Sequence, residues 1–251
     1  QTGNVFLAYR DVEQMNELIA KWKTEKSPIY DFTADDGIQH TIWVVNDDTS
    51  IKTISRLFEQ QVPQTYIADG HHRAASAAKV RAALWDAATE ESDYFLTTLF
   101  PASELQILDY NRVVKDLNGL SADELLEKIK ADFDVALVGK DPVKPTQLHS
   151  FGMYLDKNWY QLTAKEGTYQ TDPIGVLDVT ILSDSILDKH LGIKDQRTDK
   201  RIDFVGGIRG LGELQKRVDS GEMQVAFSLY PVTMEQLFDI ADSGNVAGEH
   251  W

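Results

Sequence analysis

Apolar residues recur along the 251-residue chain with two different periods. Residues 11–23 carry one at every third or fourth position, which predicts an amphipathic helix. Residues 28–33 and 38–45 are rich in β-branched and aromatic residues and flank Asp35-Asp36-Gly37, which predicts a β-hairpin. Ser121 followed by Glu124 has the pattern of a capping box, so a helix is expected to start there.

The remaining segments follow the same two periods. Further strands are expected over 3–9, 66–68, 94–101, 105–114, 133–138, 151–155, 159–163, 202–205 and 224–230. Further helices are expected over 51–59, 71–88, 121–130, 176–190, 211–219 and 233–242. Strands and helices mix without a regular strand–helix–strand alternation, so the expected fold class is α+β.

Composition then excludes several classes of protein. The formal net charge is −15 and the pI is about 4.7, whereas a general nucleic-acid binder needs a basic surface to replace phosphate counterions. No apolar run reaches the roughly 20 residues that span a bilayer, so no membrane partner is expected. The chain has no cysteine, which removes disulfides, thiolate catalysis and Cys-based metal sites and suits a cytoplasmic protein.

The most informative segment is Tyr66-Ile67-Ala68-Asp69-Gly70-His71-His72-Arg73. A strand is expected to end at Asp69-Gly70, and a helix is expected to begin directly after it. The first turn of a helix leaves backbone N–H groups unpaired and carries partial positive charge. Two imidazoles and a guanidinium at that turn add further donors, so the segment predicts an anion site, most naturally for phosphate.

The expected helix after the turn fits this interpretation. It is rich in alanine, which lets a ligand or another backbone approach closely, and Ser76 lies one turn in, where its hydroxyl can bond a phosphate oxygen or its own helix. Residues 66–82 carry a net charge of +2 in a chain of −15. Phosphate contacts are therefore expected from Gly70, His71, His72, Arg73 and Ser76.

Other interpretations of these residues stay open. The histidines can be a solvated helix end, with Arg73 paired to an acid. A metal shared by His71 and His72 is disfavoured, because neighbouring helical side chains point about 100° apart. Asp69 can hold Mg²⁺ together with substrate phosphates, orient His71, or cap the turn. Arg112, in an expected strand, can be buried opposite an acid or contact a phosphate.

A second glycine-containing segment follows the expected strand at 202–205. Its order is G-G-x-x-G-x-G over residues 206–212, which departs from the dinucleotide pattern G-x-G-x-x-G. A flexible connector is therefore favoured over a dinucleotide loop. Residues 194–217 still carry a net charge of +3, so Arg201 and Arg209 are further candidates to face an anionic ligand.

With these motifs in place, the chain resembles the bacterial DUF1015 family over nearly its whole length. The specific segment is Ile67–Arg73 followed by the alanine-rich helix. Supporting segments are Asp36-Gly37-Ile38-Gln39-His40-Thr41-Ile42-Trp43, Tyr110-Asn111-Arg112-Val113-Val114 and Leu229-Tyr230-Pro231-Val232. Members of the family extend beyond both ends, so the resemblance implies that this chain, from Gln1 to Glu249-His250-Trp251, is truncated.

The D-G-x-H-R turn is more distantly similar to the phosphate-binding turn of ParB/sulfiredoxin-like folds. That similarity implies a ParB/sulfiredoxin-like unit over 1–115 that carries the site and a second mixed α+β unit over 116–251. Sulfiredoxins have a cysteine where this chain has His71, so their reductase chemistry is excluded. The kinase-like members of the fold remain the best match.

The sequence therefore suggests a protein that binds a small phosphate ligand or nucleotide and transfers a phosphoryl group to a small hydroxylated metabolite such as serine. A nucleoside triphosphate or diphosphate would be the substrate, Mg²⁺ the cofactor, and Asp69, His71 and His72 the catalytic residues. The alternative is a nucleotide-gated binding module or NTPase switch without metabolite turnover. The sequence leaves the oligomeric state open, a homodimer included.

Overall fold

The computed structural model describes residues 3–84, 87 and 89–244. The chain divides into two compact units, Gln1–Leu105 and Gln106–Trp251. Both units contain helices and strands, which confirms the α+β fold class. Within the described residues, no helix is long and apolar enough to cross a membrane. The chain ends and Ala88, at the expected end of the alanine-rich helix, lie outside the described part.

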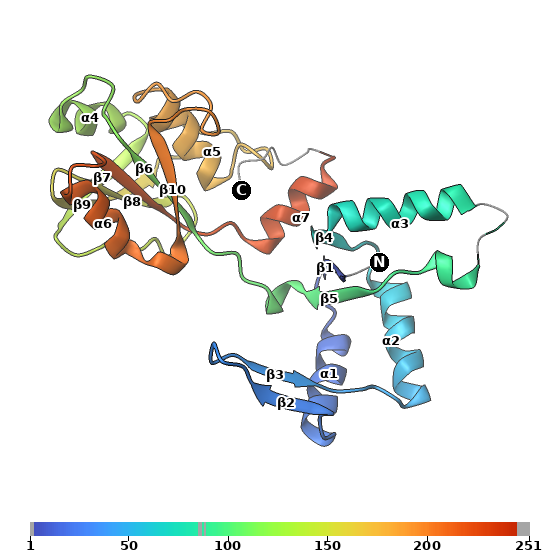
Figure 1. The fold of residues 1–251 in the computed structure, drawn as a ribbon. Helices are drawn as coiled ribbons and strands as arrows, with labels where there is room; N and C mark the ends of the chain where they lie inside the picture. Colours follow the sequence, from blue (N-terminus) through green and yellow to red (C-terminus); the bar gives the residue numbers. More distant parts are fainter. Residues whose placement is uncertain (1–2, 85–86, 88, 245–251) are drawn as a thin grey trace. The chain divides into compact units, whose positions relative to one another are not determined.

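The first unit is built on a three-stranded sheet of order β4-β1-β5 (Figure 1). The strands are β4 (Tyr66–Asp69), β1 (Val5–Tyr9) and β5 (Thr97–Pro101). The central strand β1 runs antiparallel to β4 and parallel to β5. Helix α3 (His71–Leu84) follows β4 after the single residue Gly70, as the sequence predicts, and this connection positions the candidate site.

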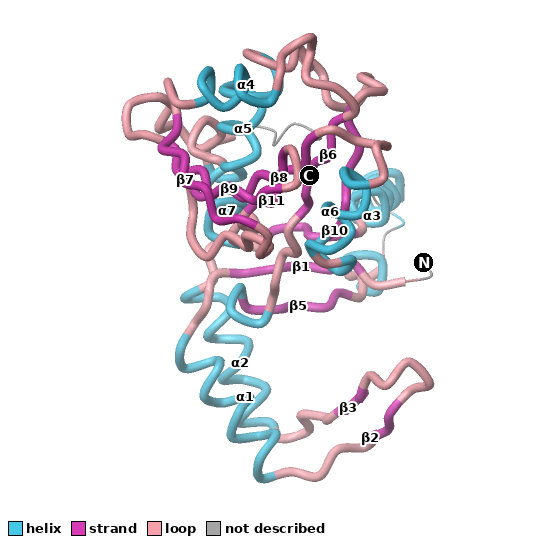
Figure 2. Tube along the Cα trace, turned by 90° about the vertical axis from the view of Figure 1, so that its left-hand side faces the viewer, coloured by secondary structure: helices cyan, strands magenta, loops and turns pink. Residues whose placement is uncertain are grey.

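Two helices of the first unit pack side by side (Figure 2). They are α1 (Glu13–Glu25) and α2 (Asp48–Gln61), which meet through Met15 and Leu57 in a small apolar cluster. The hairpin of β2 (Tyr30–Thr33) and β3 (Gln39–Ile42) connects them, in agreement with its turn sequence. This hairpin is almost entirely exposed, so the stability of the unit comes from the helices and the sheet.

The second unit contains a six-stranded sheet in which neighbouring strands are antiparallel. In sheet order the strands are β10 (Ile202–Gly206), β6 (Tyr110–Val114), β11 (Val225–Leu229), β8 (Ser150–Leu155), β9 (Asn158–Ala164) and β7 (Phe133–Gly139). From the sequence, residues 110–114 are expected in the first unit. In the structure β6 pairs with β10 and β11, so it belongs to the sheet of the second unit.

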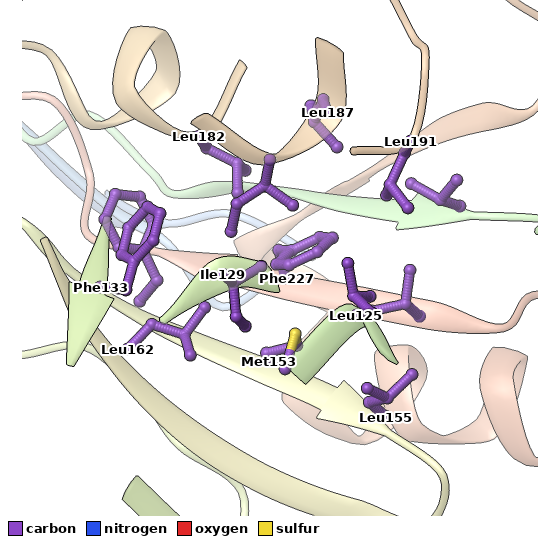
Figure 3. Packing of buried hydrophobic residues seen from close by; sticks show 14 of the residues in the cluster. Leu125, Ile129, Phe133, Met153, Leu155, Leu162, Leu182, Leu187, Leu191 and Phe227 are labelled. Atoms are coloured by element: carbon purple, nitrogen blue, oxygen red, sulfur yellow. The ribbon is translucent and has the colours of Figure 1, made fainter. Parts of the chain in front are cut away.

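Successive side chains of these strands point to opposite faces of the sheet, and they form part of two apolar clusters, one on each face. Val114 joins the larger cluster and its neighbour Val113 joins the smaller one. Helix α4 (Ala122–Ile129), helix α5 (Asp178–Leu182) and the π-helical turn Ser183–Asp188 cover the larger cluster. Figure 3 shows Leu182 and Leu187 of these segments packed toward strand residues such as Phe227. Helix α6 (Leu211–Asp219) supplies Leu214 to the smaller cluster.

Helix starts in the second unit follow the capping rules. The Ser121 hydroxyl accepts a hydrogen bond from the Glu124 backbone N–H, and the Glu124 carboxylate accepts one from the Ser121 N–H, so the predicted capping box is confirmed. The same reciprocal pair joins Thr233 and Gln236 at the start of α7 (Met234–Asp242). These bonds satisfy N–H groups that a helix leaves unpaired, so side-chain chemistry fixes where each helix begins.

A buried carboxyl group lies at the start of α5. Asp178 is 3% exposed, its Oδ1 accepts a hydrogen bond from the His149 backbone N–H at 2.9 Å, and its Oδ2 is buried without a partner in the described structure. Burial disfavours the charged carboxylate and raises the pKa of Asp178 to about 7, although the His149 N–H acts in the opposite direction. The native state therefore keeps a proton on this group that the unfolded chain loses.

This proton makes stability depend on pH. An unfolded aspartate has a pKa of about 3.9, so between that value and about 7 the native state binds more protons than the unfolded state. The free energy of unfolding is expected to fall as pH rises through this window, by at most about 1.4 kcal/mol per pH unit for this group. Urea unfolding from pH 4.5 to 7.5 measures the slope, which Asp178→Asn should reduce. Equal slopes in wild type and variant would show that Asp178 titrates normally.

Candidate functional site

The candidate site starts at the turn between β4 and α3. Gly70 has φ +92, a conformation that L side chains rarely adopt, and its carbonyl accepts the first helical hydrogen bond, from the Ala74 N–H at 2.9 Å. Glycine has no side chain to cap the first turn of α3. The backbone N–H groups of His71, His72 and Arg73 therefore lie where helix geometry supplies no internal partner, as an anion site requires.

The guanidinium of Arg73 folds back over this turn. It donates to the Asp69 carboxylate at 2.9 Å, in an ion pair whose side chains are 35% and 74% exposed. A Cβ atom added to Gly70 would lie 3.1 Å from Arg73 Nε, so the guanidinium packs directly on the glycine. An exposed ion pair of this kind contributes at most about 1 kcal/mol, which means that a phosphate can compete with Asp69 for Arg73.

The close approach of Arg73 makes Gly70 a sensitive position. We expect Gly70→Ala to cost about 1–2 kcal/mol of stability, because alanine is strained at positive φ, and to displace the Arg73 side chain as well. Gly37→Ala is the matched control, since Gly37 has φ +82 and nothing within 4 Å of an added Cβ. Urea unfolding should show a loss of stability in both variants, but only Gly70→Ala should weaken phosphate binding. Equal ligand affinities in the two variants would contradict a contact between the Arg73 guanidinium and the phosphate.

A cavity of about 550 Å³ opens beside this turn. One wall consists of α3 residues His72, Arg73, Ser76, Ala77 and Val80, and the remainder consists of Ser92 and Tyr94. We call it the α3 cavity. The structure thus brings together three of the residues that the sequence predicts for phosphate binding.

Ser92 and Tyr94 were not predicted as site residues. Ser92 lies in the 3₁₀ turn Glu90–Asp93, and Tyr94 follows it. An ion pair between Arg81 of α3 and Asp93 fastens this segment to the helix. The sequence carries no local signal for this ion pair, because its two residues lie more than a helical turn apart along the chain.

The other predicted site residues lie in different environments. His71 is exposed at the first position of α3 and is not among the described residues that line the α3 cavity. Arg112 lies in β6 of the second unit and is 2% exposed. Its guanidinium donates to Gln196 Oε1 at 3.2 Å and lies over the Phe204 ring at 4.7 Å. Arg112 therefore lines a different cavity, in the second unit, and not the α3 cavity.

The described residues do not provide a ready metal centre. Among them, no group of three or more histidine, aspartate or glutamate side chains is placed to hold an ion. Asp69 offers one carboxylate, which is already paired with Arg73. Mg²⁺ requires octahedral oxygen coordination and is usually held by one or two carboxylates together with waters and substrate phosphates. The expected Mg²⁺ site at Asp69 would therefore need the nucleotide to complete it, and it stays a prediction.

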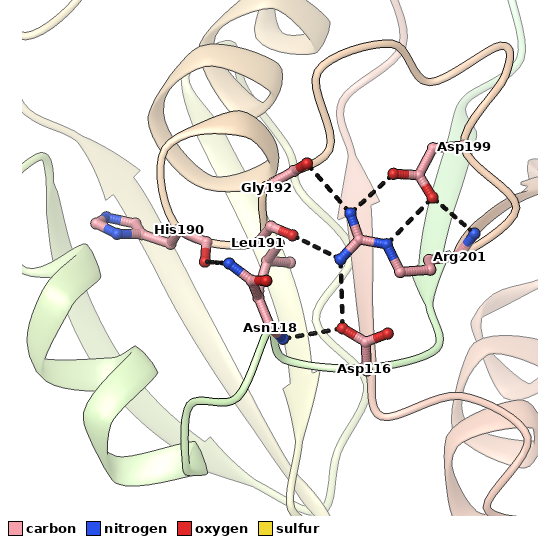
Figure 4. Close-up of polar contacts among 7 residues, drawn as sticks. All are labelled: Asp116, Asn118, His190, Leu191, Gly192, Asp199 and Arg201. Atoms are coloured by element: carbon pink, nitrogen blue, oxygen red, sulfur yellow. Dashed lines mark hydrogen bonds and ion pairs between the residues drawn. The ribbon is translucent and has the colours of Figure 1, made fainter.

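The second glycine-containing segment has a structural role. Arg201, which directly precedes the strand before this segment, forms ion pairs with Asp199 at 2.8 Å and with Asp116 at 3.4 Å and donates to the carbonyls of Leu191 and Gly192 (Figure 4). Two carboxylates thus compensate its charge. At Gly207 an added Cβ would clash with Asp109 Oδ1, so the absence of a side chain at this position permits close packing against Asp109.

A comparison with curated protein sequences finds no match. Among solved structures, a conserved hypothetical protein from Pyrococcus furiosus aligns with 14% identity and a TM-score of 0.35 over 96% of this chain and 83% of that chain. A free serine kinase in complex with AMP aligns with 13% identity and a TM-score of 0.36 over 96% of this chain and 80% of that chain. Both TM-scores are too low to carry an argument about this chain. Residues 1–180, which include the turn and α3, match the family described as protein of unknown function (DUF1015), and the chain therefore belongs to the DUF1015 family.

Proposed function

We propose that the α3 cavity binds the phosphates of a nucleotide and that the protein transfers a phosphoryl group from it to a small hydroxylated metabolite. The observation that carries this proposal is the presence of His72, Arg73 and Ser76 on one wall of a cavity of about 550 Å³ at the start of α3. In this proposal the Asp69–Arg73 turn works like the phosphate-binding turn of ParB/sulfiredoxin-like folds.

The donors at this wall suit an anion. Partial positive charge of about half a unit collects at a helix N-terminus, and the Arg73 guanidinium adds a full charge with a planar set of donors. The hydroxyls of Ser76 and Tyr94 are donors on the two sides of the cavity. The alanines of α3 leave room near the first turns, and no residue of this helix is buried. Phosphate oxygens can therefore reach both the backbone N–H groups and the side chains.

The transfer step needs positioning more than covalent participation by the protein. The acceptor hydroxyl oxygen forms a bond to the terminal phosphorus, and the bond from that phosphorus to the bridging oxygen breaks, so that a nucleoside diphosphate leaves. The hydroxyl proton passes to a base, for which His72 and Asp69 are the candidates at this turn. Arg73 would neutralise charge on the transferred group.

The direct test combines binding and product detection on the full chain. Calorimetry with ATP, ADP and inorganic phosphate in the presence of MgCl₂ should give saturable binding of at least one nucleotide. Mass spectrometry with ATP and a panel of small hydroxylated metabolites, serine included, should then detect a phosphorylated acceptor. Hydrolysis of ATP without a phosphorylated acceptor would favour the NTPase-switch alternative, and absence of nucleotide binding would refute both.

Asp69→Asn separates two proposed roles of this carboxylate, which are to compete with phosphate for Arg73 and to act as the base. The change removes a negative charge beside the proposed phosphate and frees Arg73 from its ion pair, so nucleotide affinity should rise. If Asp69 is the base, phosphoryl transfer should fall although binding improves. If His72 is the base, transfer should persist in Asp69→Asn and fall in His72→Gln. Weaker nucleotide binding in Asp69→Asn would contradict the competition between Asp69 and phosphate.

A further inference from the structure

The second unit contains a polar cavity of about 270 Å³ beside the π-helical turn Ser183–Asp188. Its wall comes from the residue before β7, the loop after β9, the loop before α5, and α5 together with the π-helical turn. Segments of π-helix are rare and frequently occur at functional sites. We call it the Ser185 cavity after the buried serine at its wall.

Ser185 places a hydroxyl group at the wall of this cavity. The residue is 7% exposed, and its hydroxyl forms no hydrogen bond with any residue that the structure describes. A buried hydroxyl without a partner is unfavourable, and buried polar groups in folded proteins are therefore hydrogen-bonded in the large majority of cases. Because Ser185 borders the cavity, a polar group of a bound ligand can be the partner of its hydroxyl.

Tyr169 supplies a second hydroxyl, which His149 holds in place. The Tyr169 hydroxyl lies 2.9 Å from His149 Nδ1, and the other ring nitrogen, Nε2, lies 3.1 Å from the Val176 carbonyl. A carbonyl only accepts hydrogen bonds, so Nε2 carries a proton, and in the neutral ring Nδ1 accepts from the tyrosine hydroxyl. The tyrosine oxygen keeps its lone pairs, so it can accept a hydrogen bond from a ligand in the cavity that it lines.

The charged side chains at the wall favour a ligand with positive charge. Lys189 Nζ donates to Asp132 Oδ2 at 2.6 Å, so these two charges compensate each other. Asp184 forms no ion pair or hydrogen bond with a described residue. Burial and the nearby charge of Asp188 raise the pKa of the Asp184 carboxyl group. A ligand cation at Asp184 would therefore compensate a carboxylate that has no counter-charge among the described residues.

The geometry points to a binding site for a small amine that carries several hydroxyl groups. Its ammonium group would lie at Asp184, and its hydroxyls would pair with Ser185 and with the Tyr169 oxygen. A hydroxyl both donates and accepts, so it matches either protein group. An engineered cavity of about 150 Å³ holds one benzene molecule, so this larger volume admits a six-membered ring with substituents. This inference rests on the second unit alone, so it stands or fails independently of the proposed phosphate site.

Three probes with a six-membered ring separate the charge from the hydroxyls. Glucosamine carries both, glucose lacks the charge, and cyclohexylamine lacks the hydroxyls. Backbone amide NMR of the full chain at about pH 6.5 measures the affinity of each probe and locates it. We expect glucosamine to bind at least about threefold more tightly than either other probe, with saturable shifts at Asp184 and Ser185. Equal affinity for glucosamine and either other probe, or shifts that leave these two amides unchanged, would overturn the assignment.

Two variants then assign the contacts. Ser185→Ala should weaken glucosamine and glucose binding by about threefold to tenfold, the loss of one hydrogen bond, and leave cyclohexylamine binding unchanged. Asp184→Asn should reduce the affinity for glucosamine to that for glucose, and because Asp184 is exposed this variant tests the site even if Ser185→Ala disturbs packing. Its matched control is Asp134→Asn, which removes the same charge from an exposed position outside the described cavity wall. Equal losses in Asp184→Asn and Asp134→Asn would show an effect of net charge alone and overturn the assignment.

Discussion

Arg73→Ala is expected to weaken nucleotide binding by about 10- to 100-fold, the loss of one strong hydrogen bond to a charged group. Two effects act in the same direction. The variant loses the guanidinium at the wall of the α3 cavity, and it leaves the Asp69 carboxylate unpaired beside the incoming phosphates. Calorimetry with ATP on the wild-type and variant chains measures the change directly.

The matched control for this prediction is Lys79→Ala. It removes the same charge from the same helix, at an exposed position that is not among the described residues lining the cavity. The double variant Asp69→Asn/Arg73→Ala should recover part of the affinity, because the unpaired carboxylate is gone. If Arg73→Ala and Lys79→Ala weaken binding equally, the effect of Arg73 is only its contribution to net charge, and the proposed phosphate contact is wrong.

The largest effect on stability is expected at Gly152, in the middle of β8. An added Cβ would clash with Ser228 Oγ and would lie 2.5 Å from the Val143 carbonyl. Those two atoms form a 2.6 Å hydrogen bond that holds residue 143 over the sheet. Gly152→Ala must break this contact, so we expect it to lower the free energy of unfolding of the second unit by about 3 kcal/mol.

Gly212→Ala provides the comparison for this loss. Gly212 lies in α6 with open space around an added Cβ and no positive φ, so the same substitution should raise stability by about 0.5–1 kcal/mol. Urea unfolding followed by tryptophan fluorescence reports on the second unit through Trp159, which is fully buried there. Similar unfolding midpoints for the two variants would contradict the packing described around Gly152.

Much of the fold can be predicted from the sequence because its signals are local. The hairpin β2–β3 forms around a turn sequence that favours it, and α4 begins at a capping box whose two bonds are both present. The strand–glycine–helix turn at Gly70 is also local, since only the positive φ of that one residue is needed to connect β4 to α3. Elements of this kind can be predicted without knowledge of tertiary contacts.

The features that could not be predicted depend on contacts between distant residues. Nothing local shows that Ser92 and Tyr94 line one cavity together with α3. Residues 110–114 are expected in the first unit but pair within the second unit, and here too no local signal could show this. An apolar strand matches either sheet by its pattern, and only its pairing with β10 and β11 decides.

The central claim is that phosphates bind at the first turn of α3. Backbone amide NMR of the full chain during titration with ATP tests it most directly, because a phosphate oxygen that accepts from an N–H shifts that resonance strongly. The proposal predicts that the largest saturable shifts belong to His71, His72 and Arg73, with inorganic phosphate affecting the same amides more weakly. Saturable shifts that leave these three amides unchanged, or no saturable shift at all, would contradict it.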